Sequence, residues 1–220
     1  ALTADEIAED IELVNRFLEL QVRYDDRMLE PAVAWQRDRD RGYAEVVICT
    51  WDRPGLFSRV TGVLASCGLN ILSAQVFTRG DSMAIDRFYL TDAVTGGLPG
   101  SEQRKEFSRQ LKTALAAITD MDLDFSSLPE SAVEYTAVTG ERIPTRIYFD
   151  NRSSEKFTVL DVETEDHVGL LYALARTLTA LGTMIVLARI NTEKGGANDS
   201  FYLLDETGGK IEDRARQQFI

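Results

Sequence analysis

The stretch TWDRPGLF at residues 50–57 returns as TEDHVGLL at residues 164–171, at an offset of 164 − 50 = 114. Further matches follow in order at this offset, and they are Leu64 with Leu178, Gly68 with Gly182, Ile71 with Ile185, Ala74 with Ala188, and Thr78 with Thr192. Residues 86–92, DRFYLTD, then align with DSFYLLD at residues 199–205, where the offset is 199 − 86 = 113. The chain therefore contains a tandem repeat, and its one-residue length change falls in a predicted hairpin loop, where such a change costs least.

Both copies predict the same order of elements, which is strand, helix, strand, strand and helix. Residues 44–50 are β-branched and apolar, as in a half-buried strand, and apolar residues then recur at helical spacing from Leu56 until Gly68. The other elements are expected at residues 70–78, 83–91 and 102–118 in the first copy, and at 157–164, 169–181, 184–192, 200–205 and from about 212 in the second. This order indicates an α+β fold of ferredoxin-like βαββαβ type, which needs a fourth strand in each copy.

Strand-like residues outside these elements are candidates for the fourth strands. Residues 145–150 are expected to take the open edge of the second copy, because no room remains after its last helix. Residues 132–138 either do the same for the first copy or form a hairpin. The resulting division is a helical connector at 1–41, a first domain at 42–119, a linker with room for an extra strand at 120–144, and a C-terminally truncated second domain at 145–220.

The composition excludes several classes of protein. The 220 residues include 24 Lys and Arg against 36 Asp and Glu, and the formal charge of −12 argues against binding nucleic acid or an anionic membrane. Two distant cysteines, Cys49 and Cys67, and the single His167 support neither a disulfide framework nor a common metal site. The chain begins without Met, carries no secretory signal and ends inside a predicted helix. We therefore expect a cytoplasmic fragment of a longer protein rather than a full-length chain with processed ends.

The repeat resembles the ACT domain, through a strand followed by DRPGLF, a helix, GLNI at residues 68–71 and the DxFY motif. With FDNRS at residues 149–153, the pair resembles the C-terminal regulatory region of the bifunctional uridylyltransferase/uridylyl-removing enzymes, which modify the PII nitrogen-signalling protein, over roughly residues 40–220. The resemblance implies two ferredoxin-like ACT domains that bind glutamine, or another small amino acid, at their interface and so control uridylylation and deuridylylation of PII. It also implies catalytic domains upstream, where any Mg²⁺ would bind, with no catalytic site or cofactor in this segment, and it allows a homodimer through ACT edges.

The resemblance places ligand-binding residues at the turn between the first strand and first helix of each copy. In the first copy these are Asp52, Arg53, Pro54, Gly55, Leu56 and Phe57, joined by Asn70 and Ile71 at the start of the next strand. In the second copy they are Asp166, His167, Val168, Gly169, Leu170 and Leu171. Because Met184 and Val168 replace Asn70 and Pro54 in the second copy, we expect one competent site or two unequal ones.

These residue types suit a free amino acid as the ligand. A helix start offers unsatisfied N–H groups and partial positive charge to a carboxylate, and a glycine lets the ligand approach the backbone. An aspartate could accept a hydrogen bond from the ammonium group, and Asn70 could bind a side-chain amide. Structural interpretations remain beside these: helix caps for the aspartates, close packing for the glycines, and turn formation for Asn70 and His167. Asp86 and Asp199 are expected on a polar strand face, in structural roles.

No catalytic constellation is found in the sequence. It has no paired motif for a nucleotidyltransferase metal site, no His-Asp pair for phosphohydrolase chemistry and no phosphate-binding glycine loop. Two other functions remain open, a ligand-free interaction module that holds catalytic domains or a partner, and a stand-alone sensor of a different amino acid.

Overall fold

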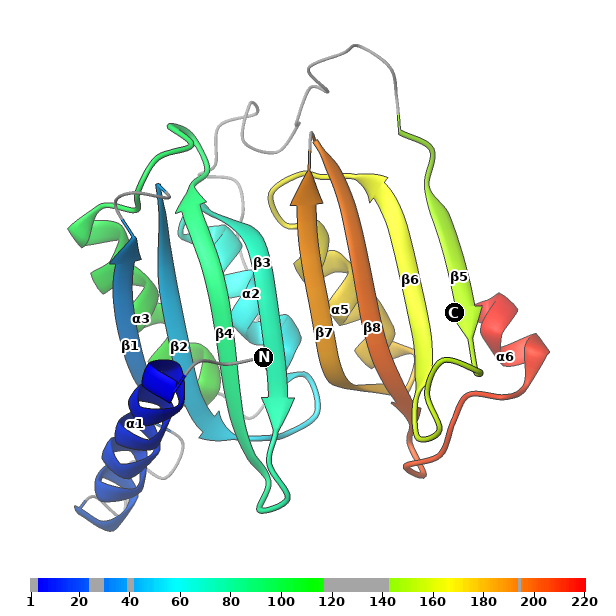
Figure 1. Cartoon of the computed structure of the whole chain (residues 1–220), viewed down its shortest axis with the longest axis horizontal. Coiled ribbons are helices and arrows are strands. Elements are labelled where there is room, and N and C mark those ends of the chain that lie inside the picture. The colour runs from blue at the N-terminus through cyan, green and yellow to red at the C-terminus, as the bar shows by residue number, and fades with distance from the viewer. Residues whose placement is uncertain (1–3, 24–29, 39–41, 117–142, 194) are drawn as a thin grey trace.

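The computed structural model describes residues 4–23, 30–38, 42–116, 143–193 and 195–220. The described part of the chain forms two similar halves that share one antiparallel sheet (Figure 1). The strand predicted at residues 132–138, and most of the predicted linker, lie outside the described residues.

Each half supplies four strands and its own helices. In the first half the elements are α1 (Ala4–Arg23), β1 (Ala32–Asp38), β2 (Tyr43–Trp51), α2 (Leu56–Ser66), β3 (Leu69–Thr78), β4 (Met83–Asp92) and α3 (Ser101–Ala116). In the second half they are β5 (Arg146–Asp150), β6 (Thr158–Glu165), α5 (Leu170–Ala180), β7 (Thr183–Glu193), β8 (Gly196–Asp205) and α6 (Arg214–Phe219). The elements predicted for both copies are therefore present, and the fold is the expected ferredoxin-like α+β type.

The strands follow the order β1-β2-β4-β3-β7-β8-β6-β5, so the second half repeats the first in reverse. Helices α2, α3 and α5 cover one face of the sheet, and α1 lies on the opposite face (Figure 1). Strand β2 has apolar residues on both faces for this reason: Val46 and Ile48 join the main core, whereas Val47 and Cys49 pack with α1 residues such as Phe17. Because side chains alternate along a strand, a continuous apolar run marks a strand buried on both sides.

The fourth strand of each half precedes its core instead of following it. The prediction for residues 145–150 is confirmed, since β5 pairs antiparallel with β6. In the first half the same edge is taken by β1, which pairs antiparallel with β2. The segment expected as a helical connector at residues 1–41 thus contains helix α1 and also a strand at residues 32–38. Trp35 shows what holds this strand, because its ring packs edge-on against Phe107 of α3 with ring centroids 5.6 Å apart.

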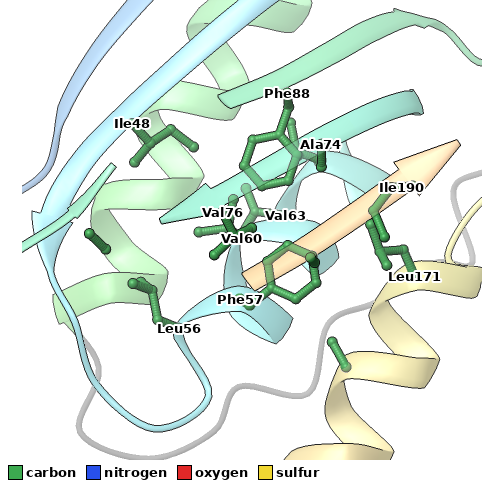
Figure 2. Close-up of a cluster of buried hydrophobic side chains, with 14 of the residues drawn as sticks. Ile48, Leu56, Phe57, Val60, Val63, Ala74, Val76, Phe88, Leu171 and Ile190 are labelled. Carbon is green, nitrogen blue, oxygen red and sulfur yellow. The ribbon is translucent and has the colours of Figure 1, made fainter. Parts of the chain in front are cut away.

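The two halves join at β3 and β7, which pair antiparallel. Gln75 pairs with Arg189, its equivalent in the repeat (189 − 75 = 114), so an approximate twofold axis passes between these two residues. Behind the strands α2 packs against α5, and Phe57, Leu171 and Ile190 belong to one hydrophobic core that includes residues of both halves (Figure 2). The line along which β3 meets β7 and α2 meets α5 is called the seam below.

Candidate functional site

Two pockets lie at the seam, and each is built from both halves. The turn-1 pocket lies at residues 52–57, between β2 and α2, is completed by residues 183–186 at the start of β7, and has a volume of about 370 Å³. The turn-2 pocket lies at residues 166–172, between β6 and α5, is completed by residues 69–71 at the start of β3, and has a volume of about 20 Å³. A ligand in either pocket would therefore touch both halves.

The structure divides the predicted site residues between the two pockets. Asn70 and Ile71 of the first half line the turn-2 pocket, whereas Met184, the equivalent of Asn70, lines the turn-1 pocket. The smaller pocket thus contains the asparagine, and the larger one lacks it. A space of about 20 Å³ holds roughly one water molecule, whereas about 370 Å³ lies in the range of small-molecule sites.

Bulges in the two seam strands sit beside the pockets. The register of β3 shifts between Ile71 and Ser73, and the register of β7 shifts between Ile185 and Leu187, at equivalent positions of the repeat. A bulge bends its strand and redirects the side chains next to it. Ile71 and Ile185 both line pockets, so the bulges occur where each strand start meets the opposite half.

Both turns enter their helices through a glycine in the left-handed conformation. Gly55 has φ 76° and Gly169 has φ 88°, and neither α2 nor α5 has a side-chain cap. The expectation that Asp52 or Asp166 caps the helix is therefore wrong, because glycine occupies the N-cap position three residues later. A Cβ added at Gly169 would meet no heavy atom within 4 Å, so its backbone conformation, not crowding, favours glycine there.

The first aspartate of each turn instead binds a threonine at the end of the next strand. The Oγ1 of Thr78 donates a hydrogen bond to Oδ2 of Asp52 at 3.0 Å. The equivalent hydroxyl of Thr192 donates to the carboxylate of Asp166. Burial raises the pKa of Asp166, and the bond from Thr192 opposes that rise. Each aspartate thereby holds its turn against a seam strand.

A second aspartate of each half is buried beneath the first. Asp86 of β4 is 1% exposed and lines the turn-1 pocket, and Asp199 of β8 is 2% exposed and lines the turn-2 pocket. Burial, reinforced by the charge of Asp52, raises the pKa of Asp86 to about 8. Burial also raises the pKa of Asp199 to about 7, with Asp166 adding to the effect and the N–H of Asn191 opposing it. Each pocket therefore has a pair of carboxyl groups: burial desolvates Asp86 in the turn-1 pocket, and both Asp166 and Asp199 in the turn-2 pocket.

Arg53 and His167 make local contacts beside the turns. The guanidinium of Arg53 donates to the Leu115 carbonyl at the end of α3, where a cation is favoured by the helix dipole. Burial, followed by repulsion from Arg59, lowers the pKa of Arg53. The Nδ1 of His167 lies 3.1 Å from the Val168 carbonyl oxygen of its own turn. Neither contact involves a catalytic partner.

Sequence reasoning missed the position of Asp86 and Asp199. They were expected on a polar strand face, but each shares its face with the phenylalanine two residues later, and Phe88 and Phe201 are buried as well. Side chains at i and i+2 lie on the same side of a strand. The repeated DxFY motif could therefore have shown that an acid points into the core of each half.

The described residues show no sign of a metal site, a membrane span or a reactive thiol. Among them, no group of three or more His, Cys, Asp or Glu side chains is placed to hold a metal ion. No helix in the described ranges is long and apolar enough to cross a bilayer. Burial raises the pKa of the Cys49 thiol to about 12 and that of Cys67 to about 11, so neither is activated as a nucleophile.

Comparison with known families defines the class of the two halves. Residues 45–99 match the ACT domain family, and residues 146–220 match the family described as ACR9-like, ACT-like domain. The chain is therefore a tandem of two ACT-type domains. Helix α1 and strand β1 lie before the first matched region.

Among individual proteins, the chain is similar to bifunctional uridylyltransferase/uridylyl-removing enzymes. It is 34% identical over 198 residues to that of Rhodospirillum rubrum, covering 87% of this chain and 20% of that protein. It is 35% identical over 175 residues to that of Azospirillum brasilense (79% and 18%), and 36% identical over 170 residues to that of Caulobacter vibrioides (77% and 18%). The chain spans about a fifth of the length of these curated relatives, and this region is of ACT type, not catalytic.

A solved structure also aligns with this chain. The crystal structure of aspartate kinase from Synechocystis has a TM-score of 0.42 at 16% identity, over 76% of this chain and 24% of that one.

Proposed function

We propose that this chain is the amino-acid-sensing module of a bifunctional uridylyltransferase/uridylyl-removing enzyme, and that it binds free glutamine in the turn-1 pocket. The observation that carries this proposal is that the larger pocket is closed by residues 52–57 of one half and residues 183–186 of the other. A ligand bound across such a seam favours the arrangement of the two halves that it fits best. In the parent enzyme, that preference would set the balance between uridylylation of PII and removal of the uridylyl group by catalytic domains outside this chain.

The polar groups of the turn-1 pocket support glutamine over glutamate. Thr179 and Thr183 line the pocket, and their hydroxyl hydrogens are donated to the carbonyls of Ala175 and Leu178 at 2.8 and 2.7 Å. The hydroxyl oxygens keep lone pairs that can accept a hydrogen bond from an amide NH₂. The glutamate carboxylate has no hydrogen to donate, so an acidic pocket of this kind favours the amide.

Calorimetric titration of the 220-residue chain tests the ligand. We expect heat and a raised Tm with glutamine, and at least tenfold weaker binding of glutamate, for the reason just given. If no amino acid produces either heat or a Tm shift, the sensor function is contradicted and a ligand-free interaction module is favoured. A response to another amino acid, with none to glutamine, would contradict the link to nitrogen sensing.

A matched pair of variants tests the pocket. Met184→Trp fills the turn-1 pocket from a side chain that is 37% exposed, so the fold tolerates it, and we expect glutamine binding to fall at least tenfold. Asn70→Trp is the equivalent change in the turn-2 pocket. Loss of binding in Asn70→Trp alone would move the site to the turn-2 pocket. In the parent enzyme, Met184→Trp should also remove the effect of glutamine on the state of PII.

A further inference from the structure

The floor of the turn-1 pocket holds a carboxyl group that the fold leaves incompletely satisfied. Asp86 is 1% exposed, and its Oδ1 has no hydrogen-bond partner among the described residues. The backbone N–H of Phe77 hydrogen-bonds to the carboxyl group. A buried acceptor without a partner costs folding free energy, so a neutral apolar residue would make the strand more stable.

Among the described residues that line the pocket, no cation is paired with this acid. From the β2–α2 turn, Asp52 adds a like charge, and the guanidinium of Arg53 is engaged with the Leu115 carbonyl. From α5 and β7, the lining residues are Thr179 and the uncharged residues 183–186. The neighbouring thiol on β2, Cys49, stays neutral because burial raises its pKa to about 12. An unpaired buried acid in a pocket with room for a ligand is complementary to a ligand cation.

The equivalent acid of the other half is placed differently. Oδ1 of Asp199 accepts a hydrogen bond from the N–H of Asn191 at 3.4 Å, as Asp86 does from the equivalent Phe77, but its pocket has a volume of only about 20 Å³. The two carboxyl groups therefore share sequence position, burial and an equivalent backbone hydrogen bond, but of the two only Asp86 has room for a ligand beside it.

We propose that Asp86 is the counter-ion for a primary ammonium group in the turn-1 pocket, and that it restricts the pocket to amine-bearing ligands such as α-amino acids. This inference rests on the proposed function for the location of the ligand, and it adds the group that selects the ligand class. The ammonium group sits between Asp86 and Asp52, and the ligand carboxylate lies toward the start of α2, where the helix dipole is positive.

The arrangement couples binding to the release of a proton. Burial and Asp52 hold the pKa of Asp86 near 8, so its carboxyl group is mostly protonated at pH 7 when the pocket is empty. An ammonium group beside it stabilises the ionised form and lowers its pKa. Glutamine binding at pH 7 should therefore release close to one proton, and affinity should rise toward a limit of tenfold per pH unit between pH 6 and pH 7.5.

The test compares glutamine with glutaramic acid, the same molecule without its amino group. In the wild-type chain we expect glutamine to bind at least tenfold more tightly than glutaramic acid. Asp86→Asn, which keeps the side-chain shape, should weaken glutamine binding by about 10–100-fold and leave the affinity for glutaramic acid within about threefold of wild type. It should also abolish proton release, which is measured by titration in buffers of different ionisation enthalpy. Asp161→Asn is the charge-matched control, because Asp161 on β6 accepts a hydrogen bond from Ser200 on β8 and lines neither pocket, and it should behave as wild type.

The outcomes separate this inference from the proposed function. If glutamine binds and Asp86→Asn binds it within twofold of wild type, the counter-ion role is wrong and the sensor stands. If glutamine does not bind but another amino acid binds in an Asp86-dependent way, the counter-ion role stands and the glutamine assignment is wrong. If no amine-bearing compound binds a wild-type chain that melts cooperatively, both are wrong.

Discussion

Asp86 and Asp199 illustrate how a buried carboxyl group links the stability of the chain to pH. Burial raises their pKa values to about 8 and about 7, while the same groups in an unfolded chain ionise near 3.8. Between these values the folded chain holds protons that the unfolded chain has lost. The free energy of unfolding contributed by each group is therefore greatest below pH 4 and falls as pH rises through the folded pKa.

Asp86→Asn should flatten this pH dependence, because the amide does not titrate. The quantity to compare is the free energy of unfolding of the variant minus that of wild type. We expect this difference to be higher at pH 8.5 than at pH 5 by on the order of 2–4 kcal/mol, since each unit of pKa shift corresponds to about 1.4 kcal/mol. Urea unfolding at the two pH values measures the difference. Parallel profiles for variant and wild type would mean that Asp86 ionises normally in the folded chain.

At the residue scale, the sequence predicted which turns line pockets better than which residues face those turns. Residues 52–57 and 166–171 do line pockets, because a glycine turn before a helix leaves a specific local pattern. The partners of those turns come from the opposite half, and nothing in the local sequence of a turn reports which strand will face it. The sequence shows that Asn70 is the equivalent of Met184 in the repeat. Its place in the turn-2 pocket, however, depends on the antiparallel pairing of β3 with β7.

At the element scale, the starts of α2 and α5 depend on backbone conformation, not on a capping side chain. Gly55 and Gly169 both have positive φ, a region that costs other residues about 1–2 kcal/mol. Asp52 is exposed and bonds to Thr78 instead of the helix.

Gly55→Ala should therefore destabilise the chain by about 1–2 kcal/mol, and Gly169→Ala should do the same, whereas Asp52→Ala should change stability by about 0.5 kcal/mol or less. Urea unfolding followed by far-ultraviolet circular dichroism measures all three. A larger loss in Asp52→Ala than in Gly55→Ala would restore the aspartate to the role of helix cap.

The elements themselves were largely predictable, and the exception has a physical explanation. Strands β2 to β4 and β6 to β8 have long apolar or alternating runs that identify them. Strand β1 is Ala32–Asp38, and a run of charges follows its short apolar part, so its period-2 pattern is hard to recognise. Its identity depends on long-range contacts such as that of Trp35 with Phe107.

At the scale of the whole molecule, one sheet and one core join the halves. The main core includes Phe57 from α2 together with Leu171 from α5 and Ile190 from β7 (Figure 2). A shared core of this kind predicts that the halves unfold together instead of as independent domains.

Leu171→Ala tests this coupling, because both tryptophans, Trp35 and Trp51, lie in the other half. We expect the free energy of unfolding to fall by about 2–4 kcal/mol, and the urea transition followed by tryptophan fluorescence to shift to a correspondingly lower urea concentration. Ile147→Ala, at a side chain that is half exposed, should leave that transition unchanged. A fluorescence transition that stays in place while circular dichroism becomes biphasic would show that the halves unfold separately.

The position of β1 has a practical consequence for anyone who wishes to produce a shorter version of this protein. A truncated chain that started at Glu45, where the ACT match begins, would lack Trp35 and leave the outer hydrogen-bonding groups of β2 bare. Bare strand edges recruit other chains, so such a product should aggregate. Expression boundaries for the first half therefore need to include β1, well ahead of the residues that match the ACT family.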